Sequence, residues 1–172
     1  MTTSDTAPTD SMDPDSPAEG PGERAHREPV EARLIATGTV LDSIVQARRE
    51  RIEELRPRFG HLRTEELPRS QRSFAAALRT RSGRSRSPQP ALIMECKAAS
   101  PSRGTIRSDY DPASLAAQYA PYAAAVSVLT EPDRFNGSFD DLAAVREVVD
   151  VPVLCKDFIV DKVQVLVARS LG

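Results

Sequence analysis

The side chains best suited to chemistry lie in two short apolar segments, one near the middle and one near the end of the chain. Glu95 and Lys97 stand two residues apart in the first segment, and Lys156 ends the second. Lysine is rare among the 23 basic residues, and arginine provides most of them. A lysine ammonium can exchange a proton under the control of its surroundings, whereas a guanidinium cannot. A carboxylate beside two lysines therefore predicts general acid–base catalysis, with a structural ion pair as the alternative.

The positions of these three residues are set by strands and helices, which the apolar pattern predicts after residue 90. Short continuous apolar runs alternate with amphipathic segments, which is typical of βαβ units around a parallel sheet. Asp111 and Ser138 are the expected N-caps of two of the helices. We expect strands at residues 91–96, 125–129 and 151–155, and helices at residues 111–119, 138–149 and 161–171.

The alternation of side chains along a strand predicts which of these residues meet. Successive residues point to opposite faces of a sheet, so Glu95 and Lys97 share one face and Cys96 lies on the other. The same parity separates Lys156 from Cys155. Because α/β barrels carry catalytic groups at the carboxyl ends of their strands, we expect two lysines and a glutamate to converge at one mouth. Both cysteines are expected to be core residues, too far apart for a disulfide.

Two loops that follow these strands are candidates for substrate contact. Ser100 and Pro101 begin a polar, glycine-containing loop, which is either a mobile lid or a plain connection. Phe135 precedes an Asn136-Gly137 turn and is either an apolar wall for an aromatic substrate or a cap of the core. The sequence alone leaves these alternatives open.

The chain divides into three parts by composition. Residues 1–36 are rich in proline and acidic residues and are expected to be a disordered tail, either inert or partner-binding. Residues 37–89 are expected to form a helical extension that ends in an arginine-rich linker. No aromatic residues alternate with these arginines, so a solvated surface is favoured over a nucleic-acid-binding arm. Residues 90–172 carry the predicted βα units.

The first helix of the extension shows clear start and stop signals. Thr39 is a suitable N-cap, and apolar residues recur at helical spacing after it, with arginine and glutamate on the other face. Pro57 and Gly60 are expected to end this helix. A second helix is expected over residues 72–81.

Composition and charge exclude several functions. The net charge of −2 over 172 residues argues against nucleic-acid and membrane-surface partners. No apolar run approaches the roughly 18 residues of a membrane span, and the start of the chain lacks a secretory-signal pattern. His26 and His61 have no neighbours that suggest a metal site. We therefore expect a cytoplasmic protein without a metal.

Three parts of the sequence together resemble one known family. They are residues 94–104 (MECKAASPSRG), residues 127–131 with 135–138 (SVLTE and FNGS) and residues 152–159 (PVLCKDFI). In this order they resemble the indole-3-glycerol phosphate synthases, most closely the bifunctional members in which a phosphoribosylanthranilate isomerase barrel follows. The resemblance covers roughly residues 37–172. Ala98 departs from it, since many members have lysine there.

The resemblance implies a (β/α)8 TIM barrel of the α/β class that needs no cofactor and serves tryptophan biosynthesis. Such enzymes convert 1-(2-carboxyphenylamino)-1-deoxyribulose 5-phosphate into indole-3-glycerol phosphate, CO2 and water. Carried over by position, Lys156 would be the general acid that activates the substrate carbonyl. Glu95 and Lys97 would hold and polarise the reacting groups.

The resemblance also implies substrate contacts and an incomplete barrel. Ser100 and Pro101 would line the loop over the substrate, while Phe135 and Phe158 would pack on the anthranilate ring. The chain reaches only through the third helix of such a barrel, so only the first three βα units are expected after the helical extension. The phosphate-binding loops of the barrel follow its later strands. The alternative function is therefore that of a truncated, inactive remnant or an interaction module.

Overall fold

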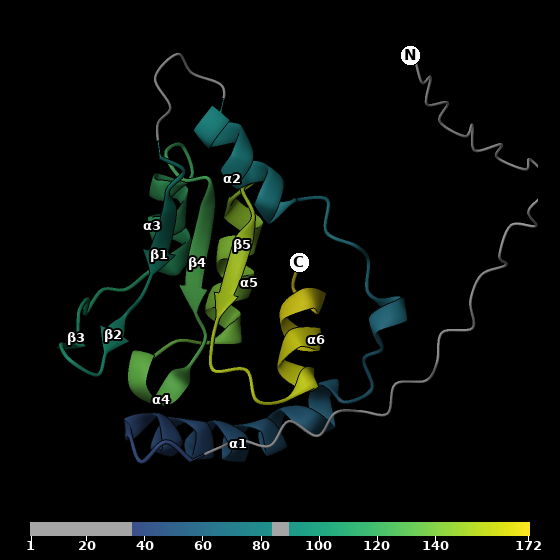
Figure 1. Cartoon of the computed structure of the whole chain (residues 1–172), viewed down its shortest axis with the longest axis vertical. Coiled ribbons are helices and arrows are strands. Elements are labelled where there is room, and N and C mark those ends of the chain that lie inside the picture. Colours follow the sequence, from purple (N-terminus) through teal and green to yellow (C-terminus); the bar gives the residue numbers. More distant parts are fainter. Residues whose placement is uncertain (1–35, 84–89) are drawn as a thin grey trace, which may run out of the picture. The chain divides into compact units, whose positions relative to one another are not determined.

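A computed structural model describes residues 36–83 and 90–172 (Figure 1). Apart from residue 36, the expected tail lies outside the described residues, and so does the end of the expected linker. Residues Ala36–Gly172 form one compact unit. Within the two described ranges, no helix combines the length and the apolar character that crossing a membrane requires.

Three parallel strands form the central sheet, in the order β1-β4-β5. They are β1 (Ile93–Cys96), β4 (Ala125–Leu129) and β5 (Val153–Lys156). Glu95 is in register with Ser127, and Ser127 with Leu154. The predicted α/β class and parallel sheet are confirmed. Strands β1 and β5 begin later than predicted, because the apolar runs extend beyond the residues that pair in the ladder.

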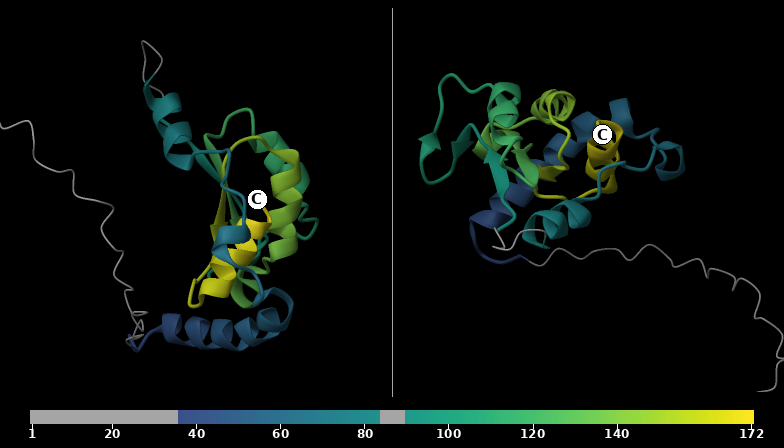
Figure 2. Two further views of the ribbon diagram at one scale, coloured as in Figure 1. Left: turned by 90° about the vertical axis from the view of Figure 1, so that its right-hand side faces the viewer. Right: turned by 90° about the horizontal axis from the view of Figure 1, so that it is seen from above.

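Helices α3 (Pro112–Tyr119) and α5 (Phe139–Val148) cover one face of the sheet (Figure 1 and Figure 2). Their N-caps are the predicted ones, since the Asp111 and Ser138 side chains each accept a backbone N–H of the first turn. Burial of apolar surface between these helices and the strands stabilises the arrangement. The buried side chains of this core include Cys96, Leu115, Ala116, Val126, Val128, Leu142 and Val145.

Helices α1 (Val40–Phe59) and α6 (Lys162–Ser170) form a second, smaller core through Ile52, Val163 and Val167. The N-cap of α6 is Asp161, whose side chain takes part in a capping box. Helix α1 begins at the predicted N-cap Thr39 and crosses the carboxyl ends of the strands (Figure 1 and Figure 2). Because active groups of α/β barrels lie at this end, α1 borders the candidate site.

The predicted end of α1 at Gly60 is confirmed, whereas the predicted stop at Pro57 is wrong. The helix continues to Phe59, and the N–H of Gly60 donates to the Arg56 carbonyl at 2.8 Å. Pro57 lies in the last turn, where its missing N–H removes a single hydrogen bond of the helix. Helix α2 (Phe74–Gly83) is shifted along the chain from its prediction, because Ser73 accepts the N–H of Ala76 as an N-cap does.

Four short elements were not predicted. They are η1 (Thr64–Glu66), β2 (Ala99–Ser100), β3 (Gly104–Thr105) and α4 (Pro132–Phe135). Strands β2 and β3 form an antiparallel hairpin in the loop after β1 and lie beside α4. Helix α2 contacts β4 on the sheet face opposite to α3 and α5 (Figure 2). The hairpin and α4 therefore flank the carboxyl end of the sheet, where the candidate residues lie.

Candidate active site

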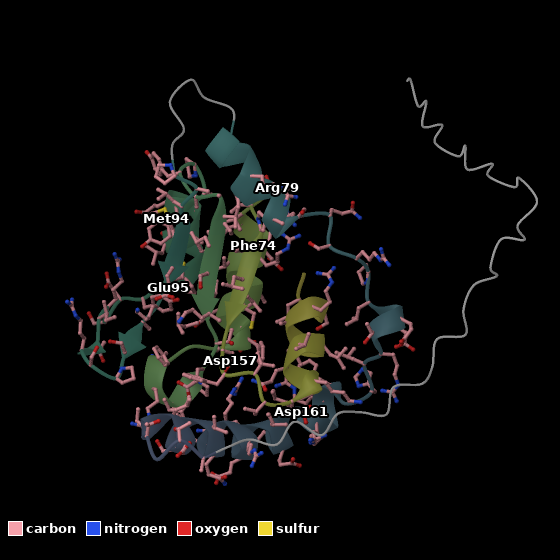
Figure 3. The ribbon with its side chains drawn as sticks, in the orientation of Figure 1. Phe74, Arg79, Met94, Glu95, Asp157 and Asp161 are labelled. Carbon is pink, nitrogen blue, oxygen red and sulfur yellow. The ribbon has the colours of Figure 1, made fainter. Side chains whose placement is uncertain are left out.

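A glutamate between two lysines forms the centre of the candidate site. The Nζ of Lys97 lies 2.8 Å from Oε1 of Glu95, and the Nζ of Lys156 lies 3.6 Å from Oε2 of the same carboxylate. All three side chains point from the carboxyl ends of β1 and β5 to one face, as their strand parity predicted. Figure 3 labels Glu95 at this end of β1.

These charged groups are accessible to solvent. The side chain of Lys156 is 49% exposed, and that of Glu95 is 30% exposed. Ion pairs at such exposure contribute little to stability, on the order of 0–1 kcal/mol. The cluster therefore contributes little to holding the fold together.

Two aromatic rings lie beside Lys156. The ring centres of Phe135 and Phe158 are 6.3 Å apart, with an angle of 39° between the ring planes. The Nζ of Lys156 lies 5.9 Å from the centre of the Phe135 ring, within the range of a cation–π contact. The lysine thus has a carboxylate on one side and an apolar wall on the other.

A buried glutamate holds Phe135 in place. Glu131 is 0% exposed and is the N-cap of α4, where it accepts the backbone N–H of Phe135 at 3.2 Å. It also accepts the N–H groups of Asp133 and Arg134, at 3.0 and 2.8 Å. Sequence reasoning missed this residue. Its signal was Glu131 directly before a proline, since proline favours the first position of a helix.

The loop after α4 returns tightly to the sheet. Asn136 adopts a left-handed conformation with φ of 50°. A Cβ at Gly137 would lie 2.3 Å from the Leu129 carbonyl oxygen, so only glycine allows this approach. This close approach keeps Phe135, which directly precedes the turn, near the end of β4 and so completes the aromatic wall.

A second buried carboxylate anchors the chain beside Lys156. The Asp157 side chain is 0% exposed and accepts hydrogen bonds from the Thr130 hydroxyl and from the Phe158 N–H, both at 2.8 Å. Its remaining partner is Arg48 of α1, whose Nε donates to Oδ1 at 2.9 Å and whose Nη2 donates to Oδ2. In Figure 3 Asp157 lies between the end of β5 and α1.

The prediction that arginines of α1 lie on its exposed face is wrong for Arg48. Arg48 is 3% exposed and lies between Ile44 and Ile52, which are 5% and 2% exposed. Residues four positions apart share a helix face, so this spacing was the available signal. The guanidinium is buried because the Asp157 carboxylate neutralises it.

The loop residues Ser100 and Pro101 lie in and beside the β2–β3 hairpin. Ser100 is half-buried and accepts the N–H of Arg103 through its carbonyl, while Pro101 is exposed. Within residues 36–83 and 90–172, no hydrogen bond joins either residue to Glu95 or to the lysines. The structure thus brings together the charged and aromatic candidates but leaves these two at the rim.

Both cysteines are free and belong to the main core or pack against it, as predicted. Burial raises the pKa of the Cys96 thiol to about 11. Burial also raises the pKa of Cys155, although the hydrogen bond with Thr130 opposes this shift. Both thiols therefore stay protonated at neutral pH, which suits packing and not nucleophilic chemistry.

Comparison with known proteins matches this sequence to one family. The family model described as "Indole-3-glycerol phosphate synthase" matches residues 41–172. The "Tryptophan biosynthesis protein TrpCF" of Corynebacterium glutamicum is 50% identical over 134 residues, which is 78% of this chain and 27% of that protein. The "Indole-3-glycerol phosphate synthase" of Crocosphaera subtropica is 40% identical over 137 residues, which is 77% of this chain and 45% of that protein. The chain thus matches less than half the length of each of these two relatives.

Proposed function

The chain belongs to the indole-3-glycerol phosphate synthase family, and we propose that the protein catalyses the ring closure that produces indole-3-glycerol phosphate. The family's members are carboxy-lyases of tryptophan biosynthesis. The proposed substrate is 1-(2-carboxyphenylamino)-1-deoxyribulose 5-phosphate. Bond formation between its aromatic ring and its carbonyl carbon is followed by loss of CO2 and of water, which accounts for every atom of the substrate.

The observation that carries this proposal is the setting of Lys156. Its ammonium lies 3.6 Å from the Glu95 carboxylate and 5.9 Å from the centre of the Phe135 ring, and half of its side chain is open to solvent. When the ring carbon attacks the carbonyl, negative charge develops on the carbonyl oxygen. Lys156 donates a proton to this oxygen as general acid, which removes the developing charge.

Glu95 and Lys97 complete the proposed catalytic group. Glu95 contacts both ammonium groups and so orients Lys156 towards the substrate. The charge of Lys97 offsets the anionic groups of a substrate that carries a carboxylate and a phosphate. After ring closure, the electron pair of the bond to CO2 returns to the aromatic system. The new hydroxyl accepts a second proton from the lysine–glutamate cluster and leaves as water, and the CH2 carbon beside the nitrogen returns a proton to the cluster, which forms the last double bond of the indole.

The aromatic pair and the hairpin are the proposed substrate contacts. Phe135 and Phe158 would pack on the anthranilate ring, since their rings form an apolar wall next to Lys156. Ser100 and Pro101 would line the loop over the bound substrate. Their position at the rim of the site supports a role in covering it.

The wider architecture is part of the same proposal. We propose that residues 90–172 are the first three βα units of a TIM barrel, with residues 37–89 as a helical extension and residues 1–36 as a tail. Ile93 and Leu154 are 47% and 41% exposed on the sheet face of Glu95. Exposed apolar residues on this face support it as the interior of a barrel, which later strands would cover.

A second enzyme unit and a location are also part of the proposal. We propose a phosphoribosylanthranilate isomerase domain, fused or separate, as a functional partner. The identity of 50% to a protein named TrpCF, of which this chain matches 27%, supports a longer, two-part protein. A cytoplasmic location is proposed because the family acts in amino-acid biosynthesis.

The role of Lys156 is tested by Lys156→Ala, with Lys162→Ala as the matched control. Lys162 is exposed at the start of α6 and makes no described ion pair among residues 36–83 and 90–172. We expect Lys156→Ala to lower kcat by about a hundredfold or more, and Lys162→Ala to keep it. Formation of indole-3-glycerol phosphate is measured, and circular dichroism verifies that each variant is folded.

Two other outcomes would contradict the proposal. Full turnover in Lys156→Ala would exclude this residue as general acid. A folded wild-type protein without turnover would instead favour the alternative, an inactive remnant or interaction module.

A further inference from the structure

Asp157 is a fully buried charge that the proposed chemistry does not use. It stands directly between Lys156 and Phe158, which both belong to the proposed site. Its carboxylate points away from that site and accepts four hydrogen bonds, two of them from Arg48. A side chain with all its acceptor positions engaged fixes the backbone to which it is attached. The direction in which the two neighbouring side chains leave the strand is fixed with it.

The arginine partner comes from a distant part of the chain. Arg48 lies in α1 and meets Asp157 through both Nε and Nη2, so the contact is bidentate and directional. The side-chain exposures are 4% for Arg48 and 0% for Asp157. The Arg48 guanidinium also lies 5.8 Å from the centre of the Phe139 ring. Neither charge has room to move without losing its counter-charge, so α1 and the end of β5 are held in one relative position.

Thr130 connects this ion pair to the rest of the site. Its N–H donates to the Lys156 carbonyl at 3.1 Å, and its hydroxyl donates to Asp157 at 2.8 Å. Thr130 also precedes Glu131, the residue that holds Phe135. The same network therefore supports the backbone of Lys156 and adjoins the turn that carries the aromatic wall.

We infer that Arg48 and Asp157 are positioning residues of the active site, through which α1 sets the direction of the Lys156 side chain. Helix α1 thereby belongs to the catalytic apparatus and is not only a cover over the end of the sheet. The kinetic part of this inference rests on the proposed function. The structural part of the inference does not rest on that function, because the position of the Lys156 side chain can be measured without turnover.

The test uses Arg48→Met and Asp157→Asn, with Arg51→Met as the matched control. Methionine keeps much of the apolar stem of arginine but removes its charge, and asparagine keeps the shape of aspartate. Arg51 lies on the same helix but is 45% exposed, and it pairs with Asp133 and Glu54 instead. Folding of every variant is verified by thermal unfolding.

The first readout is the NMR spectrum of isotope-labelled lysine side chains, in which Lys156 is assigned by Lys156→Arg. The Phe135 ring shifts the signals of a lysine held 5.9 Å from its centre. We expect Arg48→Met and Asp157→Asn to move the Lys156 signals towards those of a free lysine, while Arg51→Met leaves them unchanged. Unchanged Lys156 signals in both network variants would overturn the inference.

The second readout is steady-state kinetics. We expect kcat to fall by about ten- to a hundredfold in both network variants, with KM changed much less, because a misdirected acid impairs the chemical step. Equal loss in Arg51→Met, or an effect on KM alone, would overturn the positioning role. If Asp157→Asn fails to fold, Thr130→Val removes one hydrogen bond to the same carboxylate and should produce a smaller change in the same direction. If the wild-type protein shows no turnover, the proposed function is refuted. The NMR signals of Lys156 then still test whether Arg48 and Asp157 position this side chain.

Discussion

The buried carboxylate of Glu131 holds the turn that carries Phe135, and its removal has a calculable cost. Glu131→Ala removes three hydrogen bonds to backbone N–H groups. Asp133 and Arg134 are exposed residues, so water can replace the acceptor for their N–H groups, whereas the N–H of half-buried Phe135 is left without one. Loss of an N-cap costs about 1 kcal/mol, and a buried donor without an acceptor costs about 2 kcal/mol. We therefore expect Glu131→Ala to lower the free energy of unfolding by about 3 kcal/mol.

The assay is urea unfolding followed by circular dichroism, with two comparison variants. Glu131→Gln keeps an acceptor oxygen and the length of the side chain, so its loss should be about 1 kcal/mol. Glu147→Ala removes an exposed glutamate of α5 and should change the free energy by less than about 0.5 kcal/mol. If Glu131→Ala proves as stable as Glu147→Ala, the carboxylate does not hold the turn, and the reasoning from its burial is refuted.

Two further predictions concern buried polar groups. The Ser127 hydroxyl is buried without a hydrogen-bond partner among the described residues. In urea unfolding, Ser127→Ala should therefore be as stable as the wild type or more stable, by up to about 1 kcal/mol. A fall of about 1 kcal/mol in the free energy of unfolding would instead show that the hydroxyl has a partner. Burial raises the pKa of Cys96 from its ordinary 9.0 to about 11, so the unfolded state loses the proton first and the free energy of unfolding should fall as pH rises through this window. Cys96→Ala should show a shallower fall in urea titrations, and identical slopes would contradict the shift.

The parts of the fold that follow from nearby residues could be predicted. Thr39, Asp111 and Ser138 cap helices because their side chains accept N–H groups only two or three residues away. Strand parity depends on adjacent residues alone, which is why the meeting of Glu95 with Lys97 was foreseen. Helix caps and strand parity can be predicted because they depend only on residues within a short stretch of sequence.

The parts that depend on distant partners could not be predicted in the same way. Arg48 is buried only because Asp157 neutralises it, and nothing near either residue in the sequence indicates the other. Glu131 caps α4 although serine, threonine, aspartate and asparagine are the usual caps. Pro57 is a helix breaker in general, but its position in the last turn makes it tolerable. For Arg48 the local preference was outweighed by a distant partner, and for Pro57 by its place at the end of the helix.

The separation of Arg48 from Asp157 also constrains the order in which the protein folds. The two residues are 109 positions apart, and α1 precedes every strand of the sheet in the chain. The guanidinium cannot leave water before a carboxylate is available to receive it. That carboxylate reaches its place only when β5 has paired with β4, and closing so long a loop is entropically costly. Helix α1 is thus the first helix of the described chain, yet the burial of its Arg48 depends on the sheet that it crosses.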